Sequence, residues 1–230
     1  MTSIITRLFS FPLSLVCRLI LLLLGWSPMS ESVVNHLYKT NRGIVLFSHS
    51  SYWDFIIMAL YDLSYPEFHR KLYVLIKPQP FVYWGWLLRP LGGIPSSRLE
   101  DTHSGLVDRL VGMFADKNKD FLLLLSPKGS LQKLPWRSGY YNIAKKLNCP
   151  IIVGGIDYKD KEIRIEGFYS ADIPREELEP ILQKAVSTLI PLYPSGEWLI
   201  PITENQTVIE WSMLRYSFIL FMTIILIKYF

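Results

Sequence analysis

The amino-acid sequence predicts an α/β fold in which helices cover both faces of a mainly parallel sheet. Short, continuous apolar runs alternate with helical segments through the middle of the chain. Uninterrupted apolar strands are typical of parallel sheets, because both faces of each strand are buried. Polar residues directly follow several of these runs, and sites in such sheets open at the carboxyl ends of the strands. The length of 230 residues fits one domain with appended segments.

The individual elements follow from apolar runs, periodicity and turn residues. Strands are expected at 43–48, 72–76, 121–126 and 151–156, with a more polar edge strand at 161–167. Helices are expected at 31–39, 53–61, 102–115, 138–148 and 174–190. The last of these has Pro174 in its first turn and acidic residues behind it, which helix N-termini favour. Residues 78–88 form an aromatic-rich segment bounded by prolines, for which packing or a bilayer-facing patch are alternatives, and 91–95 form a tight passage.

Apolar residues are concentrated at the two ends of the chain, which is 50% hydrophobic overall. The run 8–26 is broken by Pro12 and Arg18 and is not followed by the small-residue cleavage site of a secretory signal. We therefore expect residues 1–30 to form a membrane-binding helix that lies in the interface, with Arg18 reaching the headgroups. Residues 211–230 are long enough to cross about 30 Å and are expected to form a C-terminal transmembrane anchor, with a buried core helix as the alternative.

Composition also excludes several classes of function. The net charge of +4 suits anionic lipid or phosphate but is too small to indicate nucleic acid. Cys17 and Cys149 form no CxxC or disulfide framework, which indicates a reducing, cytosolic face. No cluster has zinc-ligand spacing and no G-x-x-x-x-G-K loop exists, so neither a metal nor a nucleotide cofactor is expected.

His49-Ser-Ser-Tyr-Trp-Asp54 is the most informative motif in the chain. It directly follows the first expected strand and leads into a helix. A histidine at a strand end and an aspartate at a helix start can fold back towards each other at the rim of a sheet. This arrangement suits a general base whose imidazole is oriented by a carboxylate. Ser50 or Ser51 can cap the helix that begins near Trp53.

A second box with the same spacing, His103 to Asp108, has a different context. His103 continues a helical pattern of apolar residues, and positions five apart on a helix point about 140° away from each other. We interpret that pair as structural. Ser126 also follows a strand, but Ser-Pro-Lys-Gly lacks the G-x-S-x-G elbow of a serine hydrolase.

Taken in order, four blocks resemble those of the glycerolphosphate/lysophosphatidate acyltransferase family. Ser48-His-Ser-Ser-Tyr-Trp-Asp54 is similar to N-H-x-S-x-x-D, and Gly92-Gly-Ile-Pro-Ser-Ser-Arg98 to G-x-I-x-x-x-R. Ser126-Pro-Lys-Gly-Ser-Leu131 aligns with P-E-G-T-R, and Asn148-Cys-Pro-Ile-Ile-Val153 with G-V-P-I-V-P. The run 136–144 resembles W-K-S-G-F-Y-x-I-A of a compact bacterial-type branch. The resemblance covers roughly residues 44–193.

The resemblance implies a membrane-bound O-acyltransferase, and we expect its domain at 31–200, on the cytosolic face of a membrane. Acyl-CoA or acyl carrier protein would be the donor, and a lysophospholipid or glycerol phosphate the acceptor. His49 would be the general base and Asp54 its orienting partner. Arg98 would grip the acceptor phosphate, and Gly129 would let backbone approach the acceptor or the developing oxyanion. Lys128 and Ser130 belong to the same implied substrate-binding set.

Two positions depart from the pattern of the family. Lys128 stands where the family has glutamate, and Leu131 where it has arginine. Because the glutamate helps to bind the acceptor, the reversed charge predicts altered acceptor recognition or low activity. Lys128 can instead meet a phosphate or thioester oxygen as a point charge. The alternative function is a non-catalytic protein of the same fold that binds lipid or acyl-CoA.

Overall fold

The computed structural model describes residues 4–51, 53–65, 71–96, 105–129 and 135–192, and side chains from residue 12 onwards within this set. In chain order the helices are α1 (Ile4–Leu23), α2 (Glu31–Lys39), α3 (Trp53–Ser64), α5 (Gln79–Leu88), α6 (Leu106–Met113), α7 (Gly139–Leu147) and α8 (Arg175–Ser187). The strands are β1 (Arg42–Leu46), β2 (Leu72–Ile76), β3 (Gly93–Pro95), β4 (Phe121–Leu125), β5 (Ile151–Asp157) and β6 (Glu162–Tyr169). The expected anchor at 211–230 lies outside the described residues, so it stays a prediction.

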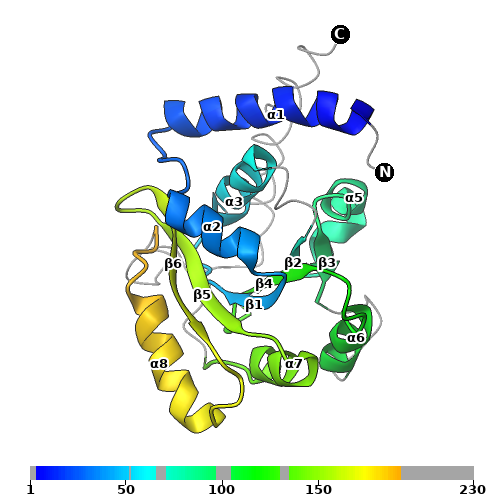
Figure 1. Ribbon diagram of the computed structural model, residues 1–230, viewed down its shortest axis with the longest axis vertical. Coiled ribbons are helices and arrows are strands. Elements are labelled where there is room, and N and C mark those ends of the chain that lie inside the picture. The colour runs from blue at the N-terminus through cyan, green and yellow to red at the C-terminus, as the bar shows by residue number, and fades with distance from the viewer. Residues whose placement is uncertain (1–3, 52, 66–70, 97–104, 130–134, 193–230) are drawn as a thin grey trace, which may run out of the picture. The chain divides into compact units, whose positions relative to one another are not determined.

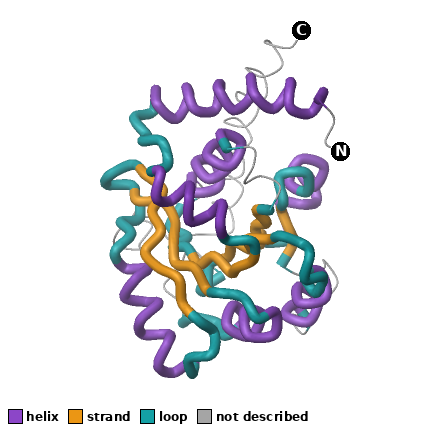
Figure 2. Tube along the Cα trace, viewed as in Figure 1, coloured by secondary structure: helices purple, strands orange, loops and turns teal. Residues whose placement is uncertain are grey.

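The described strands form one sheet in the order β3-β2-β4-β1-β5-β6. Every pairing is parallel except that of β6, which runs antiparallel to β5 at the edge. Figure 2 shows this sheet between helices on either side, which confirms the predicted fold class. The apolar strands β4, β1 and β5 are central because their residues bury side chains on both faces.

Alternate residues of β1 divide the core between the two faces of the sheet. Ile44 and Leu46 join the larger cluster, which includes side chains from α6, α7 and α8. Val45 and Phe47, which directly follows the last residue of β1, join the smaller cluster, to which α2 and α3 contribute. Figure 1 shows these two groups of helices on opposite sides of the sheet. The period of two along a strand is the reason that one apolar run can supply both layers.

Helix α1 is 20 residues long, lies within the segment 1–30 that is expected to be helical, and packs against α3. Ser14, Cys17 and Leu21, which recur at helical spacing, are buried on the side towards the domain. Arg18 does not extend freely as expected for a residue that reaches headgroups. Its Nε donates to the Ser64 carbonyl at the end of α3, 3.1 Å away. A positive charge is stabilised at this position by the partial negative charge of the helix C-terminus. In the part of the chain that the structure describes, no helix has the length and apolar character needed to span a membrane.

Some elements differ from the predicted ones for local physical reasons. The segment 78–88 is helical from Gln79, since a proline is tolerated in the first turn of a helix. The tight passage at 91–95 contains the short strand β3. Gly92 makes it possible with a positive φ of 77°, because a Cβ there would lie 2.3 Å from the Leu72 carbonyl oxygen. Helix α3 also extends three residues beyond Tyr61, to Ser64.

Candidate active site

The carboxyl ends of three neighbouring parallel strands place the sequence motifs at one edge of the sheet. The chain leaves β1 towards His49, β4 towards Lys128 and β5 towards Tyr158. The helix that follows β1 covers one face, whereas the helix that follows β4 covers the other (Figure 1). Adjacent strands whose following helices diverge in this way form a topological switch point, where open α/β sheets bind their ligands.

His49 and Asp54 are in direct contact, as the sequence predicts. The His49 Nδ1 lies 3.0 Å from Asp54 Oδ2. Since a carboxylate can only accept, Nδ1 carries the hydrogen in this bond, and Nε2 is the nitrogen that can accept a proton. The Asp54 side chain is 3% exposed and that of His49 is 26% exposed, so the acid is enclosed while its partner reaches the surface.

Backbone donors hold the Asp54 carboxylate in place at the start of α3. The N–H groups of Ser50 and Ser51 donate to Oδ2 at 2.7 and 3.0 Å. In return, the Ser51 hydroxyl accepts the Trp53 N–H at 3.1 Å, which confirms a serine at the helix start as a local cap. The loop after β1 and the first turn of α3 therefore fix each other reciprocally.

The second carboxylate oxygen of Asp54 is bonded from a distant part of the sequence. The Tyr158 hydroxyl donates to Oδ1 at 2.6 Å across 104 positions of sequence. The Ser50 hydroxyl lies 3.4 Å from the same oxygen and accepts the Leu192 N–H at 3.3 Å. Tyr158 was not among the predicted site residues. The available signal was a hydroxyl-bearing side chain directly after β5, the strand that pairs with β1.

The third block forms a tight turn after β4. The Gly129 N–H donates to the Ser126 carbonyl at 3.0 Å, with Pro127 and Lys128 as the central residues. Gly129 has a φ of 63°, a left-handed conformation that glycine adopts without strain, and its missing Cβ faces open space among the described residues. That space allows a ligand to approach. The N–H itself is used within the turn, so the oxyanion role expected of this backbone finds no support here.

The predicted residues Arg98 and Ser130 lie outside the described part of the chain. The second block is described as far as Ser96, whose N–H donates to the Ile76 carbonyl at 2.7 Å. Because β3 is parallel to β2, the chain leaves β3 at the same edge of the sheet that carries His49. The Arg109 guanidinium of α6 also donates to the Pro95 carbonyl at the end of β3.

The second His-Asp box does not join this site. His103 lies outside the described residues. Asp108 is on α6 and forms a 2.6 Å ion pair with Lys146 of α7, in which both side chains are more than half exposed. Such a pair contributes little to stability.

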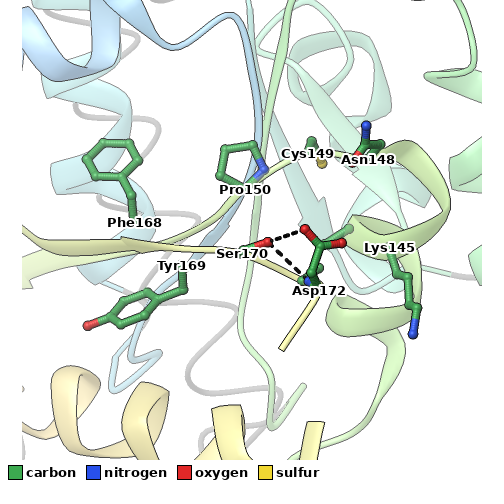
Figure 3. Close-up of a pocket in the computed structure, with 10 residues that line it drawn as sticks. Lys145, Asn148, Cys149, Pro150, Phe168, Tyr169, Ser170 and Asp172 are labelled. Atoms are coloured by element: carbon green, nitrogen blue, oxygen red, sulfur yellow. Dashed lines mark hydrogen bonds between the residues drawn. The ribbon is translucent and has the colours of Figure 1, made fainter. Parts of the chain in front are cut away.

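A pocket of about 350 Å³ (Figure 3) lies at the amino end of β5, whereas His49 follows the carboxyl end of the neighbouring parallel strand β1. The pocket is bounded by the end of α7, by Cys149 and Pro150, and by Phe168 to Asp172 at the end of β6 and in the turn that follows. The Ser170 hydroxyl donates to Asp172 Oδ2 at 2.8 Å and accepts the Asp172 N–H at 3.1 Å, so these two residues bond to each other within one turn. Burial raises the pKa of the Cys149 thiol to about 11, which leaves it protonated and unreactive near neutral pH. Catalysis is therefore better placed at the opposite edge of the sheet.

The described residues contain no group of three or more His, Cys, Asp or Glu side chains that could hold a metal ion.

Comparison with known proteins agrees with this geometry. A search of curated proteins found no match for the chain, and a search of solved structures found none either. The profile of the acyltransferase family matches residues 32–156, more than half of the chain. The matched region begins in α2, includes the His49–Asp54 pair and the turn after β4, and ends in β5. The chain therefore belongs to the glycerolphosphate/lysophosphatidate acyltransferase family, and its domain is one for acyl transfer.

Proposed function

We propose that this protein moves a fatty acyl group from a thioester to the hydroxyl of a lysophospholipid or glycerol phosphate. The donor is acyl-CoA or acyl carrier protein. The observation that carries the proposal is the His49–Asp54 bond at the carboxyl end of β1, within a domain of an acyltransferase family. Membership of the family supports acyl transfer in lipid biosynthesis, and the contact supports a general base at this site.

The geometry favours direct transfer without an acyl-enzyme. His49 Nε2 takes the proton of the acceptor hydroxyl while the hydroxyl oxygen attacks the thioester carbonyl carbon. The tetrahedral intermediate then collapses, the carbon–sulfur bond breaks, and the imidazolium returns its proton to the leaving thiolate. Asp54, held by two backbone N–H groups, keeps Nδ1–H in place and stabilises the imidazolium. The acyl group thus passes directly from the thioester to the acceptor hydroxyl, and the enzyme is regenerated without a covalent intermediate.

Recognition of the acceptor involves the turn after β4 and the block that ends in Arg98. Lys128 is half-buried in this turn, one strand away from His49. Its ammonium group meets a phosphate or thioester oxygen as a point charge, and Arg98 provides a forked donor for the acceptor phosphate. A cation in place of the family's glutamate makes the preferred acceptor different from the usual lysophosphatidate.

The protein acts at a membrane surface, because one substrate and the product reside in lipid. Leu15, Leu19 and Leu22 lie on the side of α1 away from α3 and are each more than half exposed. On α5, Tyr83 and Trp86 are also largely exposed, and such aromatic side chains favour the headgroup region. An exposed leucine stripe on a helix is suited to lie in the interface. The domain is on the cytosolic side, where its two buried thiols stay reduced.

The proposal is tested by incubating the detergent-solubilised protein with radiolabelled acyl-CoA or acyl carrier protein and a panel of acceptors. The panel contains glycerol 3-phosphate and lysophospholipids with different headgroups, and products are resolved by chromatography and mass spectrometry. We expect label in one phospholipid class. Release of free fatty acid alone would identify a hydrolase instead. Binding of acyl-CoA without any transfer would favour the non-catalytic alternative.

A further inference from the structure

The bond between Tyr158 and Asp54 gives the catalytic pair a third member. Oδ2 of Asp54 is shared by His49 and two backbone N–H groups, while Oδ1 receives the Tyr158 hydroxyl at 2.6 Å. Among the hydrogen bonds of the described residues, the other donor to Oδ1 is the Ser50 hydroxyl, and its distance of 3.4 Å is at the limit of a hydrogen bond. The Tyr158 hydroxyl therefore supplies the short bond on this side of the carboxylate.

The ring of Tyr158 is held where this bond requires it. Tyr158 is the first residue after β5, and its N–H donates to the Ile190 carbonyl at 2.9 Å. Its ring packs edge-on against Trp26, with ring centroids 5.4 Å apart. Trp26 is 6% exposed and also packs edge-on against Tyr61 of α3. Contacts from three parts of the chain thus fix the direction of the hydroxyl.

Trp26 in turn connects this cluster to helix α1. Its N–H donates to the Leu21 carbonyl at 2.8 Å, in the last turn of α1. The next N–H, that of Ser27, donates to the Lys161 carbonyl in the β5–β6 turn at 2.9 Å. The Lys161 Nζ donates to the Leu24 carbonyl at 3.0 Å. Figure 1 shows this turn beside the segment that joins α1 to α2. The end of α1 and the turn that carries Tyr158 are therefore tied to each other directly.

We infer that Tyr158 is a positioning residue for acyl transfer: it holds the Asp54 carboxylate in the orientation that presents Oδ2 to His49. The inference rests on the proposed role of His49 as general base. The three bonds to Oδ2 hold the carboxylate from one side only, and rotation about its bond to Cβ moves Oδ2 away from His49 together with Oδ1. The Tyr158 bond to Oδ1 opposes this rotation. Without it, His49 spends less time with Nδ1–H bound and Nε2 available as a base.

Tyr158→Phe removes the hydroxyl and retains the ring that packs on Trp26. Tyr61→Phe is the matched control, because Tyr61 contacts the same tryptophan but donates its hydroxyl to the Ser27 carbonyl. We expect kcat of Tyr158→Phe to fall by roughly 5- to 30-fold with KM for the acceptor little changed, which is smaller than the about 10²- to 10⁴-fold contribution of a general base. Tyr61→Phe should keep kcat within about twofold.

A second readout needs no activity. In protein labelled with ¹⁵N-histidine, the ring nitrogens of His49 are assigned by comparison with His49→Ala, since the chain has four histidines. We expect the wild type to show one tautomer, with the hydrogen on Nδ1, and Tyr158→Phe to show a mixture, while Tyr61→Phe resembles the wild type.

The outcomes separate the two proposals. If the wild type transfers no acyl group but Tyr158→Phe still changes the His49 tautomer, the proposed function is overturned and the role of Tyr158 in orienting Asp54 is kept. Tyr158→Phe with wild-type kcat and a wild-type His49 spectrum overturns the positioning role. An equal loss of kcat in Tyr158→Phe and Tyr61→Phe also overturns it, because that result indicates weaker packing around Trp26 in general.

Discussion

Lys128 distinguishes this site at the scale of single residues, because it reverses the charge that the family carries in this block. The side chain is half-buried in a turn held by the Ser126–Gly129 hydrogen bond, so its position is set by backbone. In the proposed acceptor site, a cation at this position changes which headgroups bind. The preference among acceptors should therefore respond to this one residue.

Lys128→Glu is expected to lower kcat/KM for the preferred acceptor by about tenfold, which corresponds to about 1.4 kcal/mol. Competing acceptors should be affected less, so the order of preference changes. The measurement is kcat/KM across the acceptor panel. Lys117→Glu, which makes the same charge change at an exposed position near the amino end of β4, is the control. Unchanged acceptor choice and rate in Lys128→Glu would refute this role.

Among the helices, α1 carries the exposed leucine face that is proposed to insert into the membrane interface. A cysteine introduced at Leu19 and labelled with an environment-sensitive fluorophore should become quenched by nitroxide-labelled lipid tails when vesicles are added. Burial raises the pKa of both native thiols, Cys17 and Cys149, to about 11, so a thiol reagent at pH 7 selects the introduced cysteine. The same label at Ile181, an exposed position on α8, should not be quenched. Absence of quenching at position 19 contradicts interfacial insertion of α1.

The turn after β5 depends on Asp157, which is fully buried. Burial raises its pKa, but N–H donors from Asp160, Ile190 and Lys159 together with the Arg164 guanidinium outweigh burial, so the pKa lies below its usual value. A pKa lowered by folding adds stability above the pKa of the unfolded state, and that stability is lost as pH falls through the folded value. Asp157 thereby stabilises the element that presents Tyr158.

Asp157→Asn is expected to reduce the free energy of unfolding by about 2–4 kcal/mol at pH 7, because hydrogen bonds to a charged group are lost. The difference from wild type should shrink as pH falls below about 4, the usual carboxyl range, since the wild-type acid then becomes neutral as well. Denaturant unfolding at pH 7 and at lower pH measures it. A difference that stays constant with pH would show that the charge of Asp157 does not matter.

At the scale of the whole molecule, the local parts of the site were predictable and the distant parts were not. The apolar runs 121–125 and 151–157 imply buried strands, and the spacing of His49 and Asp54 at a strand-to-helix junction implies their contact. The order of strands is set by packing between segments far apart in sequence, and no local pattern records it. The Tyr158 bond depends on that order, because it exists only when β5 lies beside β1.

The N-terminal segment also makes contacts that no local sequence pattern predicts. Its helix was predicted from the apolar run, but Arg18 finds a partner at the end of α3 because the two helices pack together. In the same way, β3 depends on the close approach of Gly92 to Leu72 in a neighbouring strand. Periodicity along one segment reports burial, whereas a partner elsewhere in the chain decides what a polar or small residue does.

The most direct test of the central claim compares His49→Ala with His36→Ala in the acyl-transfer assay. His36 is an exposed histidine on α2 that bonds to the Ser32 carbonyl of its own helix, so its loss controls for removal of an imidazole. If His49 is the general base, kcat/KM falls by about 10²-fold or more in His49→Ala and by less than about threefold in His36→Ala. A His49→Ala protein that retains more than about a tenth of wild-type transfer would contradict the account.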